Sequence, residues 1–252
     1  MFFSRDVLKI DPAQQLEKLS KFMVDKLNVV FRRKGVIVGL SGGIDSACIA
    51  AVAVHAIGKE KVVGLVLPES ESNPISSEYA VKHAQALGIE HRQINISATV
   101  DSVVQYTWRD EFMQKLVPEY KPGYKYNITL PTDLLDRDTF SFYSLQVQMP
   151  DGEIKKKRLN LEEFRTITSF ANIKIRARML HLYAEAEKRN LLVVGTTNRT
   201  EFLLGDFCKY GDGGTDIEPL TYLYKNQIYQ LADYLDIIPE IIHRQPSPDT
   251  FS

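Results

Sequence analysis

Glycine and serine residues surround a single aspartate in "GLSGGIDSACIAA", residues 39–51. Gly42 and Gly43 follow a short apolar run and precede a helix-like run. Glycine lets the backbone take positive φ and lets a ligand approach the chain closely. The first N–H groups of a helix lack intrahelical partners and lie at the positive end of its dipole. This spacing predicts a phosphate-type anion site, to which Ser41 and Ser46 add hydroxyl donors.

An aspartate inside this predicted anion site, Asp45, makes sense only together with a cation. A carboxylate and phosphate oxygens are a usual set of ligands for Mg²⁺. Glu201 comes five residues after Thr196, where an apolar run ends, and is the second carboxylate that could meet such a metal. The plainer alternatives are that Ser41 caps the helix around a tight turn and that Glu201 is an exposed acid at a helix start.

Two polar side chains on one helix and a glycine-rich loop could hold a second ligand. Asn172 and Arg176 are four residues apart, so that an amide and a guanidinium share one helix face. A surface salt bridge is the other explanation for Arg176. The loop "KYGDGGTD" contains too much glycine for a helix or strand and is expected to display its charged side chains. These are Lys209, Asp212 and Asp216.

Strands and helices alternate along most of the chain, and this alternation predicts the elements that position these residues. The expected strands cover residues 36–40, 62–68, 91–96 and 191–196, and the expected helices cover 45–57, 76–87 and 160–189. Such alternation implies parallel strands joined by right-handed crossovers. The predicted fold is α/β, a doubly wound parallel sheet flanked by helices, with its ligand at the carboxyl ends of the strands.

The alternation breaks between about residues 107 and 165. "VPEYKPGYKYNITLP", residues 117–131, is rich in Pro, Gly and Tyr, which favours a loop. "SLQVQMPDGEIKKKRL", residues 144–159, alternates apolar and polar residues around Pro150-Asp151-Gly152, which predicts a β-hairpin. We expect a single domain over residues 1–252, with this loop and hairpin region inserted into it.

Composition sets limits on partners and compartment. The chain has 252 residues, enough for one large α/β domain. Its 31 basic and 32 acidic side chains nearly balance, so that bulk charge gives no reason to expect a nucleic-acid or membrane partner. Cys48 and Cys208 form no CxxC pair, and neither a signal peptide nor a membrane-spanning run is apparent. We therefore expect a cytoplasmic protein.

Several strings, taken in order, resemble a known family. "SGGIDS" resembles SGGxDS, the pyrophosphate-binding loop of the ATP pyrophosphatase superfamily, whose members cleave ATP to AMP and pyrophosphate. "ANIKIRARM" and "GTTNRTEFLLGDFCKYGDGGTDIEPLTYLYK" resemble NAD synthetase. They contain its N-x-x-x-R-x-R-M helix, its G-T-x4-E segment, its F-x-K-Y-G-D-G-G-x-D loop and its P-L-T-x-L-x-K element. The resemblance covers roughly residues 35–100 and 170–248, without the inserted region.

The resemblance implies a fold like that of the adenine nucleotide alpha hydrolases and a specific reaction. Deamido-NAD is amidated to NAD with ATP and ammonia, through an adenylated intermediate, with release of AMP and pyrophosphate. A homodimer is also implied. Only 40 residues precede Ser41, too few for the glutaminase domain of glutamine-using relatives, so free ammonia or a separate glutaminase is expected. The family continues past "RQPSPDTFS" into a tail that helps complete the site.

The resemblance also assigns roles to individual residues. ATP is expected to contact Ser41, Gly42, Gly43, Asp45, Ser46, Leu67, Thr196, Lys225 and Ser247. Asp45 and Glu201 are expected to hold Mg²⁺, and Asp45 and Lys225 are the expected catalytic residues. Deamido-NAD is expected to contact Asn172, Arg176, Lys209, Asp212 and Asp216.

Two other interpretations stay open at this point. A GMP-synthetase-like amidase or a tRNA-modifying enzyme would share the SGGxDS loop. The later motifs disfavour the first of these, and the balanced charge and missing CxxC pair disfavour the second. A non-catalytic nucleotide-binding protein would keep the turn and lose the paired acids, whereas both Asp45 and Glu201 are present here.

Overall fold

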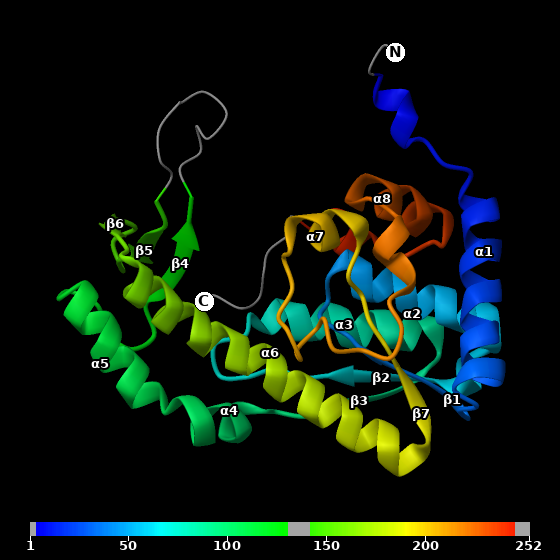
Figure 1. Cartoon of the computed structure of the whole chain (residues 1–252), viewed down its shortest axis with the longest axis horizontal. Coiled ribbons are helices and arrows are strands. Elements are labelled where there is room, and N and C mark those ends of the chain that lie inside the picture. The colour runs from blue at the N-terminus through cyan, green and yellow to red at the C-terminus, as the bar shows by residue number, and fades with distance from the viewer. Residues whose placement is uncertain (1–3, 131–141, 245–252) are drawn as a thin grey trace. The chain divides into compact units, whose positions relative to one another are not determined.

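The computed structural model describes residues 4–130 and 142–244 (Figure 1). Contacts divide the chain into two compact units. The described part of the first unit comprises residues 4–68, 74–96 and 175–244, and that of the second comprises 69–73, 97–130 and 142–174. The sequence-based limits of the inserted region lie inside the second unit. The single domain expected over the whole chain stays a prediction.

The first unit is built on a parallel sheet. Within the described residues it has four strands, in the order β3-β2-β1-β7. Their bounds are Gly35–Gly39 for β1, Val62–Val66 for β2, Glu90–Gln93 for β3 and Leu191–Val194 for β7. β1 lies in the centre, where Val38 pairs with Gly64 on one side and with Val194 on the other. The predicted parallel arrangement is confirmed.

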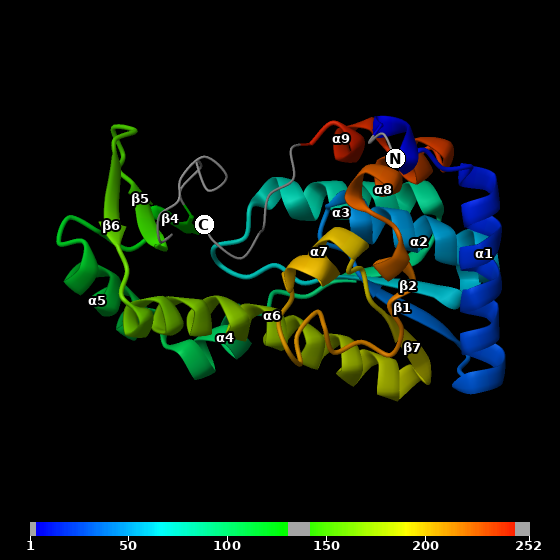
Figure 2. The same ribbon diagram turned by 45° about the horizontal axis from the view of Figure 1, so that its top comes forward.

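Helices cover both faces of this sheet (Figure 2). α2 (Ile44–Ile57) and α3 (Pro74–Leu87) lie on one face, and the part of α6 (Leu161–Arg189) that belongs to the first unit lies on the other. Val36 and Val38 of β1 pack into the core beneath α2. On the opposite face, a Cβ at Gly39 would lie 3.2 Å from the side chain of Leu182 in α6. The sheet is therefore doubly wound, as the alternation of strands and helices predicts.

Shorter elements complete the first unit. Its further helices are α1 (Pro12–Asp25), α7 (Arg199–Leu204), α8 (Lys225–Tyr234) and α9 (Pro239–Ile242). Single helical turns lie at Arg5–Leu8, Lys26–Val30, Lys59–Lys61 and Pro219–Tyr222. α1 begins where Pro12 sets the first turn and the Asp11 carboxylate accepts the N–H of Gln14 at 3.1 Å. No helix in the described part of the chain is both long enough and apolar enough to cross a membrane.

The second unit combines helices with an antiparallel sheet. Over its described residues the strands are β4 (Lys125–Thr129), β5 (Ser144–Gln148) and β6 (Ile154–Arg158), in that order. The helices are α4 (Ser97–Val104), α5 (Tyr106–Leu116) and the first part of α6. Leu145 and Val147 of β5 are buried, and Gln146 between them is less buried, because strand side chains alternate between faces.

Two sequence predictions about this unit have different outcomes. The hairpin around Gly152 is confirmed, because β5 and β6 pair antiparallel and Gly152 has a φ of 88°. The loop over residues 117–131 is wrong in part, because β4 occupies 125–129. Tyr126 of β4 is buried in the core, and the backbone pairs with β5. Long-range pairing thus overrides the local signal of proline, glycine and tyrosine.

A buried ion cluster ties the short segment 69–73 to the helices of the second unit. The Lys174 side chain is 1% exposed, and its Nζ contacts Glu71 and lies 3.2 Å from Oε1 of Glu69. Arg109 contacts Glu71 at 2.5 Å and Asp110 at 2.7 Å. Burial by itself would raise the pKa of Glu69, but the charge of Lys174 and the hydrogen bonds from the Tyr106 hydroxyl and the Glu71 N–H together outweigh it, and the pKa is lowered. Glu69 therefore stays ionised in the core.

Removing the buried ammonium should destabilise the fold. Lys174→Met leaves the carboxylate of Glu69, whose side chain is 0% exposed, without its cation. We expect the free energy of unfolding to fall by about 3 kcal/mol or more in urea denaturation followed by circular dichroism. The matched control is Lys157→Met, which breaks a partly exposed pair with Glu163 and should cost less than about 1 kcal/mol. Equal losses for the two variants would contradict this account of the cluster.

Candidate active site

The turn between β1 and α2 has the backbone geometry of an anion cradle. Gly42 has a φ of 73°, and a Cβ there would lie 2.2 Å from the carbonyl oxygen of Ser76, so that only glycine fits. Gly43 is the N-cap of α2 and makes no side-chain cap bond. Among the described residues, no side chain therefore caps the first N–H groups of α2, which are the groups that an anion would meet.

The two serines of the turn hold its shape. The Ser46 hydroxyl donates to the Gly43 carbonyl at 3.0 Å and accepts the Ser41 N–H at 3.2 Å. The Ser41 hydroxyl accepts the Gly43 N–H at 3.2 Å. The alternative in which Ser41 caps α2 is wrong, because its hydroxyl bonds the N-cap residue itself instead of the first helical turn.

One ammonium group lies between two carboxylates beside this turn. Asp45 is in the first turn of α2, Glu201 is in α7, and Lys225 begins α8. The Lys225 Nζ contacts Oδ2 of Asp45 and lies 3.8 Å from Oε1 of Glu201. The structure thus brings together three residues that the sequence assigned to metal and phosphate binding.

Electrostatics at this site favour a cation. Burial and the charge of Asp45 raise the pKa of Glu201, against the opposing effect of Lys225. No group of three or more His, Cys, Asp or Glu side chains that could hold a metal ion is found in residues 4–130 and 142–244. Two carboxylates together with phosphate oxygens are nevertheless a set that Mg²⁺ accepts, so Asp45 and Glu201 fit a metal that arrives with a nucleotide.

Asn198 is a site residue that the sequence interpretation missed. It is fully buried, and its Nδ2 donates to Oδ1 of Asp45 at 3.0 Å. Its Oδ1 accepts the N–H groups of Thr200 and Glu201, and the Glu201 carboxylate accepts the Asn198 N–H at 3.1 Å. This reciprocal pair is a capping box, and its spacing of three residues could have revealed Asn198. Asn198 thus holds both carboxylates, that of Asp45 through its side-chain amide and that of Glu201 through its backbone N–H.

The expected ATP residues at the strand ends lie where the fold predicts. Leu67 directly follows β2, is buried, and accepts the Arg178 Nε at 3.2 Å through its carbonyl oxygen. Thr196 follows β7 and is partly buried. Both are at the carboxyl edge of the parallel sheet, where α/β folds bind ligands. Ser247, the last of the expected ATP residues, lies outside the described residues.

The residues expected to bind the second nucleotide are only partly brought together. In the first unit, the Arg176 Nε donates to the Lys209 carbonyl oxygen at 3.1 Å, which joins α6 to the glycine-rich loop. The sequence left open whether Arg176 forms a surface salt bridge. In the structure its Nε instead donates to a backbone carbonyl oxygen. Asn172, four residues earlier in the same helix, belongs to the second unit.

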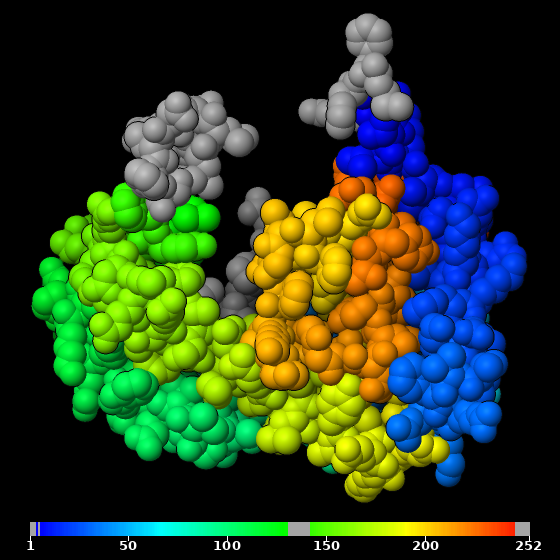
Figure 3. Space-filling view, viewed as in Figure 1, coloured from blue at the N-terminus to red at the C-terminus, as the bar shows by residue number. Residues whose placement is uncertain are grey.

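The glycine-rich loop does not display its two acids as expected. The loop is at the surface of the first unit, where Tyr210 is 73% exposed (Figure 3). The Asp212 carboxylate accepts the Cys208 N–H at 2.7 Å, and burial raises its pKa. The Asp216 carboxylate accepts the Val193 N–H at 2.8 Å and the Tyr183 hydroxyl at 3.1 Å. Both acids turn back to satisfy backbone donors, whereas Lys209 is exposed.

Glu218 is a second residue that the sequence interpretation missed. Its carboxylate accepts the Thr215 hydroxyl at 2.8 Å and the Thr197 N–H at 3.1 Å. A Cβ at Gly195 would lie 2.1 Å from this carboxylate, so only a glycine at position 195 leaves room for the Glu218 side chain. Burial raises the pKa of Glu218 to about 7, although the bonds from the threonines act in the opposite direction. The residue thus anchors the segment between β7 and Asn198.

The raised pKa of Glu218 predicts a pH-dependent stability. Between pH about 4.5 and 7 the folded chain keeps a proton that the unfolded chain releases, so the wild type loses stability as the pH rises. Glu218→Gln removes this titration. The stability of this variant relative to the wild type should therefore rise from pH 5 to pH 8, by up to about 3 kcal/mol in thermal and urea unfolding.

The control for this measurement is Glu240→Gln. The bond from Lys82 lowers the pKa of the partly exposed Glu240 carboxylate. The stability of Glu240→Gln relative to the wild type should therefore not rise over the same interval. A Glu218→Gln difference that is the same at pH 5 and at pH 8 would contradict the inferred titration.

Comparisons with known proteins identify relatives of this chain. The family model described as NAD synthase matches residues 15–120 and 139–252. The NH(3)-dependent NAD(+) synthetase of Rhizobium meliloti is 38% identical over 252 residues, which are 100% of this chain and 75% of that protein.

Two solved structures extend the comparison to the fold. The NMN synthetase of Francisella tularensis has a TM-score of 0.68 at 26% identity, over 96% of this chain and 78% of that one. The NH3-dependent NAD synthetase of Campylobacter jejuni, in complex with the nitrate ion, has a TM-score of 0.65 at 27% identity. The match covers 96% of this chain and 79% of that one. On its sequence and on its fold, this chain belongs to the NAD synthase family.

Proposed function

We propose that this chain amidates deamido-NAD to NAD, with ATP and ammonia as the other substrates. The strongest single support is the position of Lys225 between Asp45 and Glu201, beside the glycine turn. Membership of the NAD synthase family and the 38% identity to an NH(3)-dependent NAD(+) synthetase support the same reaction.

The chemistry of the substrate explains the need for ATP. A carboxylate is a poor acceptor for ammonia, because its leaving group would be oxide. When a carboxylate oxygen attacks the α-phosphorus of ATP, pyrophosphate leaves and an acyl adenylate forms. Ammonia then attacks the acyl carbon, AMP leaves with the original carboxylate oxygen, and the amide loses a proton to solvent. Binding both nucleotides in one site supplies much of the rate, because the reacting atoms are held together.

Each group of the site has a part in this reaction. The uncapped N–H groups at the start of α2 and the Lys225 ammonium stabilise the negative charge that grows on the leaving pyrophosphate. Asp45 and Glu201 would hold Mg²⁺, which supplies further positive charge to the phosphate oxygens when it is bound. Asn198 keeps Asp45 in place by its hydrogen bond of 3.0 Å.

The remaining roles rest on the resemblance. Arg176 and Lys209, which are joined by a hydrogen bond, contact deamido-NAD together with Asn172, Asp212 and Asp216. The chain works as a homodimer on free ammonia or on ammonia from a separate glutaminase. A reducing cytoplasmic compartment suits Cys48 and Cys208, which are both buried and not joined in a disulfide.

Turnover assays test the proposed reaction. Purified chain with ATP, Mg²⁺, ammonium and deamido-NAD should form NAD, AMP and pyrophosphate in equal amounts, and omission of any one substrate should stop all three products. Asp45→Asn should lower kcat by at least about 100-fold, because the partner of Lys225 and of the metal loses its charge. The control Asp25→Asn changes an exposed aspartate in α1 and should keep wild-type kcat.

The acyl substrate needs its own comparison, because one structural neighbour is titled NMN synthetase. We expect kcat/KM to be at least about tenfold higher with deamido-NAD than with nicotinic acid mononucleotide, a difference of about 1.4 kcal/mol. A higher kcat/KM with nicotinic acid mononucleotide would make that compound the substrate, and the reaction would still be an ATP-dependent amidation. AMP release that needs neither acyl substrate, or near-normal kcat in Asp45→Asn, would contradict the proposed function itself.

A further inference from the structure

Arg244 reaches the glycine turn from a distant part of the sequence. It follows α9 in the chain, and its Nη2 donates to the Ser76 hydroxyl at 2.8 Å. Its Nη1 donates to the Gly42 carbonyl oxygen at 3.4 Å. One guanidinium therefore connects the turn that follows β1 with the first turn of α3.

Gly42 is held from two directions. On one side Gly42 packs against the backbone of Ser76 so closely that an added Cβ would lie 2.2 Å from the Ser76 carbonyl oxygen. On the other side its own carbonyl oxygen accepts the Arg244 guanidinium. The two donors that Arg244 uses belong to one planar fork, which a lysine ammonium does not reproduce. The positive φ of Gly42 is thus fixed by partners outside the turn.

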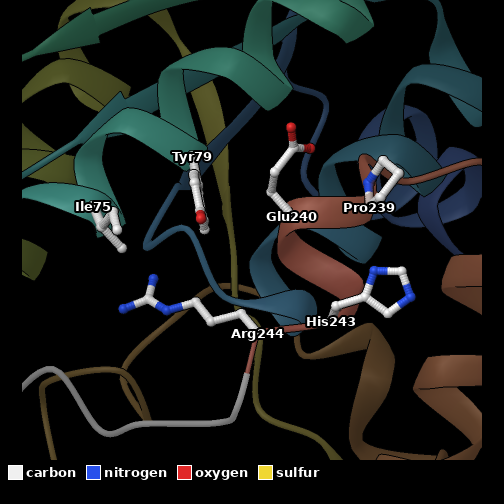
Figure 4. A pocket seen from close by; sticks show the side chains of 6 residues that line it. All are labelled: Ile75, Tyr79, Pro239, Glu240, His243 and Arg244. Atoms are coloured by element: carbon white, nitrogen blue, oxygen red, sulfur yellow. The ribbon is translucent and has the colours of Figure 1, made fainter.

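The charge of Arg244 has no acidic partner in the part of the chain that the structure describes. Arg244 lines a pocket of about 470 Å³ together with Ile75, Tyr79, Pro239, Glu240 and His243 (Figure 4). Its guanidinium lies beneath Tyr79, 5.9 Å from the ring centroid, whereas the side chains of Glu240 and His243 point away from it. Glu240 is paired with Lys82 instead.

An arginine beside a phosphate loop, without a carboxylate to neutralise it, favours an anionic ligand there. We propose that Arg244 is a positioning residue for the ATP polyphosphate. It holds Gly42 in the conformation that presents the N–H groups of the turn, and its charge adds to the positive potential of the cradle. This role depends on one part of the proposed function, namely that the glycine turn binds ATP.

Substitutions at Arg244 test this role through binding and kinetics. Arg244→Met should raise the KM for ATP and the inhibition constant of pyrophosphate about tenfold, while the KM values for deamido-NAD and ammonium change less than twofold. Arg244→Lys keeps the charge and loses the fork, so it should restore only part of both values. The control Lys82→Met removes the cation that pairs with Glu240 in the same pocket, and should match the wild type in both values.

Calorimetric titration of the folded variants with pyrophosphate and Mg²⁺ gives a second measurement that needs no turnover. Tenfold weaker binding by Arg244→Met, with partial recovery in Arg244→Lys, would support the role even if deamido-NAD proved to be the wrong substrate. Wild-type affinity in Arg244→Met would overturn it. So would an equal loss in Lys82→Met, or equal increases in the KM values for both nucleotides, because these indicate a general structural effect.

Discussion

The contact of one ammonium with two carboxylates is the interaction on which the rest of the site depends. Lys225 meets Asp45 across 180 positions of sequence and lies 3.8 Å from Glu201. Burial and the nearby charge of Asp45 together raise the pKa of Glu201, so that the pair needs a cation. The sheet satisfies this requirement, because β1 and β7 are neighbours and deliver α2 and α7 to the same edge.

A layer of residues behind the site keeps this arrangement in place. Asn198 joins Asp45 to the start of α7, Glu218 anchors the segment between β7 and α7, and Arg244 joins the glycine turn to α3. The serine hydroxyls inside the turn are likewise used in internal hydrogen bonds. Groups held in this way need little reorganisation when charge develops on a phosphate, which is the main source of electrostatic catalysis.

The sequence predicted those features that depend on local patterns. The short β-branched strands, the glycine turn and the hairpin at Gly152 follow from nearby residues. The features it missed depend on partners far along the chain. β4 forms because β5 pairs with it, and Asp216 turns inward because the Val193 N–H needs an acceptor. Glu218 is marked by no motif, since only the fold places it against Gly195.

The path of oxygen during the reaction tests the central claim most directly. Deamido-NAD labelled with ¹⁸O in both oxygens of the nicotinate carboxylate should be converted with ATP, Mg²⁺ and ammonium, and the products analysed by mass spectrometry. The account predicts that one labelled atom appears in AMP for each NAD formed, that the other stays in the amide, and that pyrophosphate carries none. NAD formed together with unlabelled AMP would contradict attack of the carboxylate on the α-phosphorus at this site.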